Sequence, residues 1–296
     1  MENTARTPAK FSDRPFWNKT GLDWVSMTFL LVTPFIAIAG VTVWIVNGWA
    51  TGWHWLHFVL GFVVSGITVT AGYHRLFSHR SYETGWPLKL FYLLFGAANF
   101  QNSALRWASK HRYHHRFVDT DSDPYDINKG FFWAHMGWIM TGKAMHHDTQ
   151  ILKRYTPDLS KDPFHVALTT WHWVPQVVVG LLLLAIGGVP YVLWGVFFRT
   201  TFGLHCTWAV NSATHLWGSR RFATRDDSTN NWWVAMLTWG EGWHNNHHAH
   251  PVSARHGLAW YEIDFNYAGI KALESLGLAW DVKVAKVNQT LGEEAA

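Results

Sequence analysis

This chain has little cysteine and few charged residues. Its single cysteine, Cys206, excludes an intramolecular disulfide framework and a cysteine-based metal site. Charged residues make up only 15% of the 296 positions, whereas 49% are hydrophobic and 17% are aromatic, including 21 Trp and 19 Phe. This composition argues against a soluble protein. The net charge of +4 would raise the question of nucleic acid in a soluble protein. Here the positions of the basic residues follow a membrane pattern, so we expect no nucleic-acid partner.

Four apolar runs are long enough to cross a bilayer, which takes about 20 helical residues. We expect spans at residues 24–46, 53–73, 164–187 and 190–215. The connectors at 47–52 and 187–190 are short and contain glycine, so the spans should form two hairpins. Three shorter apolar pieces, residues 88–107, 131–141 and 232–243, are rich in Trp or interrupted by polar residues. We expect these pieces to lie along the membrane surface.

The basic residues predict the orientation of the spans. Of the 24 Lys and Arg residues, four precede the first span, twelve lie between the second and third, and seven follow the fourth. The remaining one, Arg199, lies within the fourth span, and neither short connector has any. Because basic segments stay on the cytoplasmic side, both termini and both large polar segments should be cytoplasmic.

Eight of the 19 histidines form three boxes on that side of the membrane. The first box is the pair His74 and His79 after the second span, and the other two share the spacing H-x-x-H-H. Residues i, i+3 and i+4 lie on one face of a helix, so each H-x-x-H-H box can present its imidazoles to metal. The boxes contain His111, His114 and His115, and then His244, His247 and His248.

A fourth element, Asn211 and His215, ends the fourth span with an i, i+4 spacing that aims both side chains at one point. Nine histidines and one asparagine suffice for two metal ions with four or five nitrogen ligands each. The paired Glu-x-x-His motifs typical of helical-bundle di-iron proteins are absent. Carboxylates that orient ligand imidazoles are expected nearby, and the candidates are Asp119, Asp121, Asp123, Asp227 and Glu241. His250 and His256 are the other histidines closest to the boxes, and their roles stay open.

These residues resemble the membrane fatty-acyl desaturases of the stearoyl-CoA (delta-9) type. The resemblance covers about residues 20–285 and rests on motifs in matching order. They are GYHRLFSH at 72–79, QNSALRWASKHRYHH at 101–115, DTDSDPY at 119–125, GFFWAHMGW at 130–138, NSATH at 211–215 and GEGWHNNHH at 240–248. The resemblance implies four transmembrane helices in two hairpins and a cytoplasmic helical cap, an all-α integral membrane fold. It also implies two iron ions held by the nine histidines, with Asn211 acting through a water, and O2 as co-substrate.

The resemblance further implies a closed tunnel in which the acyl chain bends beside the metals. Residues resembling those at the bend are Gln101, Trp107 and Thr207, and Phe62 and Gly66 resemble the residues that close the far end. Asn102 matches a head-group position. Acyl-CoA members often carry Arg-Asp just before the second box, whereas this chain has Ser109 and Lys110. The carrier is therefore open between CoA, acyl-carrier protein and a lipid.

The chain has no haem, flavin or cysteine-cluster motif, so the two electrons of the reaction must come from outside. We expect a donor resembling cytochrome b5, ferredoxin or rubredoxin to dock on the cytoplasmic face. The host membrane should be the bacterial inner membrane rather than the endoplasmic reticulum. Zinc can replace iron at imidazole sites in a purified sample.

Two other functions compete with desaturation. A fatty-acyl hydroxylase on the same scaffold differs only in its product. A metal-binding or metal-transport protein would need an ionisable path, yet the spans contain no Asp or Glu away from their edges. The expected organisation is a cytoplasmic segment 1–23, a first hairpin 24–73, a first cap segment 74–163, a second hairpin 164–215 and a second cap segment 216–296.

Overall fold

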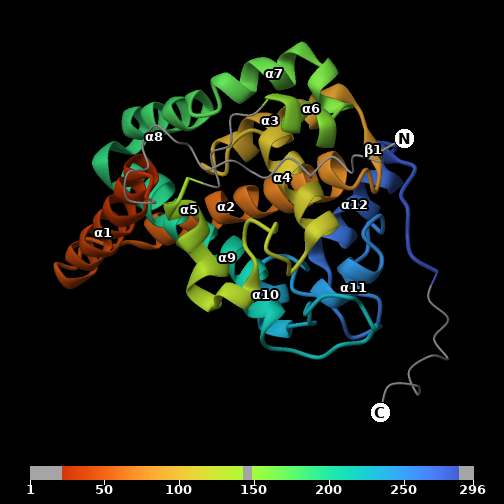
Figure 1. The fold of residues 1–296 in the computed structure, drawn as a ribbon. Coiled ribbons are helices and arrows are strands. Elements are labelled where there is room, and N and C mark those ends of the chain that lie inside the picture. Colours follow the sequence, from red (N-terminus) through yellow and green to blue (C-terminus); the bar gives the residue numbers. More distant parts are fainter. Residues whose placement is uncertain (1–21, 143–148, 287–296) are drawn as a thin grey trace.

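The computed structural model describes residues 22–142 and 149–286, and most of the expected segment 1–23 lies outside this range. Helices make up most of the described chain (Figure 1). Its one sheet pairs two short antiparallel strands, β1 (Glu83–Thr84) and β2 (Ala279–Trp280). The helices, in chain order, are α1 (Trp24–Val46), α2 (Gly52–Ile67), α3 (Trp86–Ala97), α4 (Ala104–Phe117), α5 (Trp138–Met140), α6 (Thr149–Tyr155), α7 (Pro163–Thr170), α8 (Val174–Val192), α9 (Arg199–Ser212), α10 (Trp232–Leu237), α11 (His244–Ala249) and α12 (Phe265–Ser275).

Three helical segments of the described chain are long and apolar enough to cross a membrane, namely residues 24–46, 52–78 and 174–215. The first is α1, which begins after the N-capping side chain of Asp23 and has the bounds that the sequence predicts. The second joins α2 to η2 (Thr68–Ser78), a π-helical segment. Many apolar side chains of these helices face outward, as Phe35 and Ile186 do, with 72% and 74% of their surface exposed. A membrane protein places apolar side chains outward in this way because lipid surrounds them.

The third segment, with 42 residues, folds back on itself. Gly188 interrupts α8 with a φ of +68°, a conformation that glycine adopts without strain. Beyond this break, Val196 lies 3.8 Å from the position of a Cβ added at Gly180. Gln176 likewise accepts a hydrogen bond from Arg199, 23 residues further along the chain. Contacts across such separations require an antiparallel pair, so α8 and α9 form a hairpin.

The expected span 164–187 is not one helix. α7 ends at Thr170, and α8 begins at Val174 after the break at Trp171–Trp173. Leu168 of α7 is buried in the largest apolar core of the protein, and Phe164 packs against that core. α7 therefore belongs to the compact region of the molecule, because its apolar face contacts protein. The sequence pattern misses the break because α7 and α8 are both apolar.

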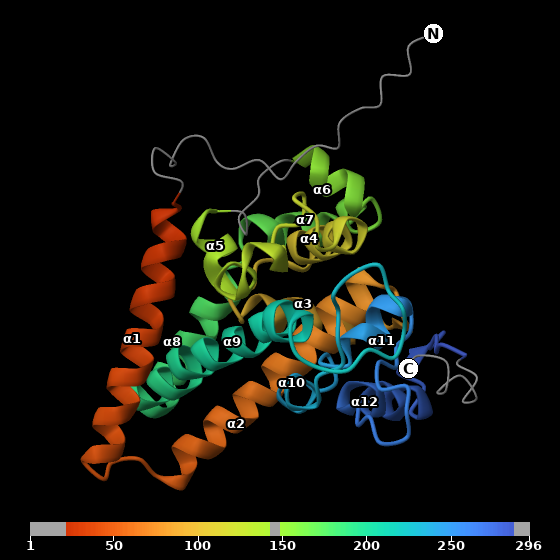
Figure 2. The ribbon, with the colours of Figure 1, turned by 60° about the horizontal axis from the view of Figure 1, so that its bottom comes forward.

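The expected helix at 88–107 is also divided. α3 ends at Ala97 and α4 begins at Ala104, and the residues between them include Phe100 and Asn102 with positive φ values of 54° and 69°. Positive φ is uncommon for residues other than glycine and often marks a functional site. Figure 2 shows α1, α2, α8 and α9 extending to one side of the molecule, away from the shorter helices α4, α6, α7, α11 and α12. The histidine boxes lie among these shorter helices and at the adjoining end of η2.

Candidate metal centre and acyl tunnel

The π-helical segment η2 brings His74 and His79 together. In an α-helix, residues five apart are rotated by roughly 140° from each other, because each residue turns the helix by about 100°. In η2 the backbone hydrogen bonds run from i+5 to i, and the amide of His79 donates to the carbonyl of His74 at 3.1 Å. Their ring centroids consequently lie 4.8 Å apart. π-Helical turns are frequent at functional sites, and this one turns two side chains toward one point.

The second box lies on α4, which begins where the hydroxyl of Ser103 accepts a hydrogen bond from the amide of Arg106. The third box lies on α11. His215 is the last residue of the short 3-10 segment η7 (Ala213–His215), which directly follows α9. The structure divides each H-x-x-H-H box between two clusters. In the second box, His111 and His115 lie in one cluster and His114 lies in the other. In the third box the assignment is reversed, because His247 joins the cluster of His111 and His115, whereas His244 and His248 join that of His114. The five-histidine cluster contains His74, His79, His111, His115 and His247, and the four-histidine cluster contains His114, His215, His244 and His248.

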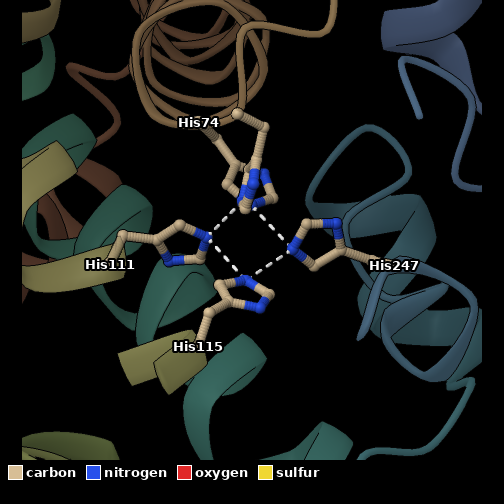
Figure 3. A group of neighbouring side chains, drawn as sticks. His74, His111, His115 and His247 are labelled. Atoms are coloured by element: carbon tan, nitrogen blue, oxygen red, sulfur yellow. Dashed lines mark hydrogen bonds between the residues drawn. The ribbon is translucent and has the colours of Figure 1, made fainter. Parts of the chain in front are cut away.

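In the five-histidine cluster, the Nε2 atoms face one another (Figure 3). His79 and His111 are 2.7 Å apart at these atoms, and His111 and His115 are 3.0 Å apart. His247 completes the ring, with its Nε2 2.9 Å from His115 and 3.2 Å from His74.

The four-histidine cluster lies beside the first. The rings of His115 and His248, one from each cluster, are 4.6 Å apart. Within the cluster, Nε2 of His248 is 3.0 Å from Nε2 of His244, and the ring of His215 is 5.1 Å from that of His244. Asn211 lines the same cavity as His114 and His244.

Carboxylates face the outer nitrogens of four of these histidines. Nδ1 lies 2.7 Å from a carboxylate oxygen in His114, 3.2 Å in His215 and 3.0 Å in His248, and in His74 it contacts Glu241. The partners of the first three are Asp123, Asp119 and Asp226. Three of the five predicted carboxylates, Asp119, Asp123 and Glu241, are therefore at the site.

The other two predicted carboxylates are elsewhere. Asp121 is exposed, and the carboxylate of Asp227 is 59% exposed and lies near Arg220. The residue that contacts His248 is the neighbour Asp226, which is not among the carboxylates predicted from the sequence. Asp226 accepts from the backbone and hydroxyl of Ser228, and this turn directs its other oxygen inward. The sequence Asp226-Asp227-Ser228 indicates such a turn, since Asp-x-Ser turns are common, and this turn is the signal that could have identified Asp226.

Burial and neighbouring imidazoles lower the pKa values of six of the nine histidines. Burial, with repulsion from the adjacent histidines, holds the pKa values of His79, His111, His115, His244 and His247 well below their usual range. The pKa of His248 is lowered to about 4 by burial, although Asp226 raises it. Burial raises the pKa of Asp226, but hydrogen bonds from His248 and Ser228 outweigh this effect and lower it.

The donor set fits metal ions. Where Nδ1 donates its proton to a carboxylate, Nε2 carries a lone pair, so we assign this tautomer to His74, His114, His215 and His248. Lone pairs that converge within 4.8 Å of one another repel unless a cation lies between them. Neutral imidazoles with outward N–H donors are the form that binds metal.

A cavity of about 340 Å³ adjoins both clusters. His74, His111, His114 and His244 lie in its wall, together with apolar side chains of α1 and α9. A smaller cavity of about 30 Å³ shares Gln101, Thr207 and several neighbours with it and extends toward Phe62 and Gly66. All six predicted tunnel residues line these two cavities.

The three predicted bend residues are joined by hydrogen bonds. The amide of Gln101 donates to the Thr207 hydroxyl at 3.1 Å, and the indole of Trp107 donates to the Gln101 oxygen at 3.2 Å. Trp107 also stacks on His111 with ring centroids 4.9 Å apart. This hydrogen-bonded group therefore contacts the five-histidine cluster directly.

Trp239 lies at the far end of the smaller cavity. A Cβ added at Gly66 would overlap the Trp239 indole, so only glycine leaves room for that ring. Phe62 packs 5.8 Å from Trp239 and 5.1 Å from Phe202, measured between ring centroids. Phe62 and Gly66 are predicted at this end from the sequence, whereas Trp239 is not.

Of the Ser109–Lys110 pair, Lys110 lines the larger cavity. Ser109 is fully buried, and the Lys110 ammonium lies 4.9 Å from the centre of the Trp138 ring, in a cation–π contact. Lys110 and Asn102 both line the cavity. Burial, together with Arg106, lowers the pKa of Lys110 to about 7.

Known proteins resemble this chain over most of its length. Residues 47–281 match the family model described as Fatty acid desaturase. The chain is 42% identical to the sn-1 stearoyl-lipid 9-desaturase of Anabaena variabilis, over 92% of this chain and 97% of that protein. It is 41% identical to the sn-2 palmitoyl-lipid 9-desaturase of Nostoc, over 88% and 90% of the two chains. The icosanoyl-CoA 5-desaturase of Limnanthes douglasii is 39% identical, over 78% and 65%.

Proposed function

The chain belongs to the fatty acid desaturase family, and from this premise we propose that it introduces a cis double bond at position 9 of a saturated acyl chain carried in a membrane lipid. The observation that carries this proposal is a largely apolar cavity that adjoins two convergent histidine clusters. Neither feature alone would specify the reaction, because the histidine clusters supply only a metal site and the cavity only selects a substrate.

We propose that the nine histidines hold two iron ions, with Asn211 contributing through a water. His74, His79, His111, His115 and His247 would hold one ion, and His114, His215, His244 and His248 the other. Iron and dioxygen would supply the oxidising power needed to remove hydrogen from an unactivated methylene. Zinc, which also prefers imidazole, can occupy the same residues in a purified sample.

The protein's own role in the reaction is positioning. The saturated chain lies in the larger cavity and bends beside Trp107, Gln101 and Thr207, which their hydrogen bonds hold in place. Trp107 stacks on His111, so the carbons at the bend lie closest to the five-histidine cluster. Holding one C–C bond there decides which hydrogens are removed. The apolar walls exclude water from the reacting carbons.

The overall reaction converts a CH2–CH2 unit, O2, two electrons and two protons into a CH=CH unit and two waters. The electrons come from an external protein resembling cytochrome b5, ferredoxin or rubredoxin. We propose that an acidic face of this donor docks on the basic cytoplasmic surface of the protein.

We propose a lipid carrier for the acyl chain. Relatives of this chain include desaturases named for lipids and others named for acyl-CoA, so family membership leaves the choice open. The Ser109–Lys110 pair favours a lipid, because acyl-CoA members often have Arg-Asp at these positions and Lys110 lies in the cavity wall. A compact ammonium stacked on Trp138 suits an ester or phosphate oxygen.

We further propose that α1, α2 with η2, and both arms of the α8–α9 hairpin cross the membrane as four spans. Both termini would then be cytoplasmic, and residues 74–163 and 216–296 would form the cap. The bacterial inner membrane is the proposed location, and membrane lipid is both the surroundings and the substrate.

Expression in a host that lacks this desaturase activity tests the proposal. Gas chromatography with mass spectrometry of the host lipids should reveal a new monounsaturated acid with the double bond at position 9. A hydroxylated acid would indicate the hydroxylase instead, and an unchanged profile with the protein present in the membrane would contradict both functions.

A further inference from the structure

His256 lies behind the five-histidine cluster, in the loop between α11 and α12. Only 1% of its surface is exposed. Its ring centroid is 4.5 Å from that of His247 and 5.4 Å from that of His74. The proposed metal set does not use it.

The backbone of His256 is held on both sides. Its amide donates to Asp264 at 2.7 Å, and its carbonyl accepts from the side chain of Asn246 at 2.9 Å. Asn246 lies on α11 directly before His247. The loop therefore keeps the His256 ring against the third histidine box.

Glu241 lies between His256 and His74. One carboxylate oxygen accepts two N–H groups of Arg75, at 3.1 and 2.8 Å. The other contacts Nδ1 of His74 and lies 3.3 Å from Nδ1 of His256. The Glu241 carboxylate therefore lies where it can accept from both rings.

His247 lacks the outer carboxylate that His74, His114, His215 and His248 each have. Its Nδ1 is buried and has no hydrogen-bond partner within residues 22–142 and 149–286, and the same holds for Nε2 of His256. A metal-binding histidine almost always donates its second ring N–H to an acceptor. The ring packed against His247 that could accept is His256.

We propose that His256 is a positioning residue of the five-histidine metal site. Its Nδ1–H donates to Glu241, and its Nε2 accepts from Nδ1–H of His247, directly or through one water. Glu241 then orients His74 directly and His247 through His256. This role rests on the metal-binding part of the proposed function, since it needs a metal at the cluster. A third ion bound by His74, Glu241 and His256 is the competing arrangement, and the Arg75 guanidinium on Glu241 disfavours it by repulsion.

Three variants of the full chain test the role after purification and loading with iron. His256→Phe keeps a ring but removes both nitrogens, whereas His256→Gln keeps a donor and an acceptor. His250→Phe is the matched control, because His250 follows the same box but packs on Phe222 and belongs to neither cluster. Iron per chain is measured during chelator titration, and Mössbauer spectra report the two sites separately.

We expect His256→Phe to lose one of its two irons at a chelator concentration about 10- to 100-fold lower than wild type. One Mössbauer component should disappear first, while His256→Gln and His250→Phe retain both. Equal iron retention in His256→Phe and wild type would overturn the role. Simultaneous loss of both irons would also overturn it, as would three ions in wild type and two in the variant. If wild type binds two irons but forms no olefin, the proposed function fails while this role stands.

Discussion

Each histidine of the two clusters has two ring nitrogens with different tasks. In His74, His114, His215 and His248 the Nδ1 atom faces a carboxylate, and this contact sets both the tautomer and the rotation of the ring. The convergent Nε2 atoms are thereby prepared for metal before it binds. The box spacing predicts which histidines take part, because i, i+3 and i+4 share a helix face. It does not predict how each box is divided between the clusters, which depends on the angle at which α4 meets α11.

A substitution of Asp226 tests whether its contact with His248 matters for the metal site. Asp226→Asn removes the charge that holds His248, so activity and iron affinity should each fall by about 10- to 100-fold. Iron content and initial rates of desaturation measure both effects.

The adjacent Asp227→Asn is the control for this variant, because the carboxylate of Asp227 is largely exposed and forms only an ion pair with Arg220 at 3.7 Å. Its activity should equal wild type. Equal losses in the two variants would mean that the contact between Asp226 and His248 does not matter.

Helices and their interruptions determine where these residues lie. The bounds of α1 follow from its apolar run and from Asp23, and the sequence predicts both. The π-helical form of η2, the break between α3 and α4, and the separation of α7 from α8 do not follow from composition. Each depends on tertiary contacts, such as the burial of Leu168 of α7 in the core. Local hydrophobicity therefore predicts the long helices but misses the irregular segments that form the site.

Gly66 on α2 tests the end of the tunnel. A side chain at Gly66 would overlap the Trp239 indole, so Gly66→Leu should push this ring into the smaller cavity and shorten the tunnel. The ratio of products from short and long saturated chains should shift toward the short chain by about 10-fold or more. Gas chromatography of competition reactions measures this ratio. Gly269→Leu on α12 is the control, because an added Cβ there contacts nothing within 4 Å. An unchanged chain-length profile in Gly66→Leu would exclude this end of the tunnel.

Arg75 links η2 to the C-terminal region of the cap. It is fully buried and pairs with Glu241 and Asp264 at 2.8 and 3.0 Å. Arg75→Leu would leave two buried carboxylates without their cation, which should cost about 3–5 kcal/mol in the free energy of unfolding. Thermal or denaturant unfolding in detergent provides the measurement.

Arg80→Leu is the matched variant for this comparison. Its ion pair with Asp158 is half exposed, so the expected cost is at most about 1 kcal/mol. A loss as small in Arg75→Leu as in Arg80→Leu would refute the stabilising role of the buried network.

For the whole molecule, the distribution of basic residues predicts on which side of the membrane the histidines lie. Cys206 is buried, so single cysteines can be added on a nearly unreactive background. In bacterial cells made permeable only at the outer membrane, an impermeant maleimide should label Asn47→Cys. It should label Lys286→Cys only after the inner membrane is opened. Labelling of Lys286→Cys in sealed cells would reverse the proposed orientation.

The central claim is that the two histidine clusters hold iron and use it to desaturate an acyl chain. The most direct measurement is single-turnover conversion of a saturated acyl lipid by the purified, iron-loaded and chemically reduced protein, with His111→Ala beside it. The account predicts two irons per chain and one monounsaturated product that requires O2, and a rate at least about 100-fold lower in the correctly inserted variant. Full conversion by His111→Ala, or by wild-type protein stripped of metal, would contradict it.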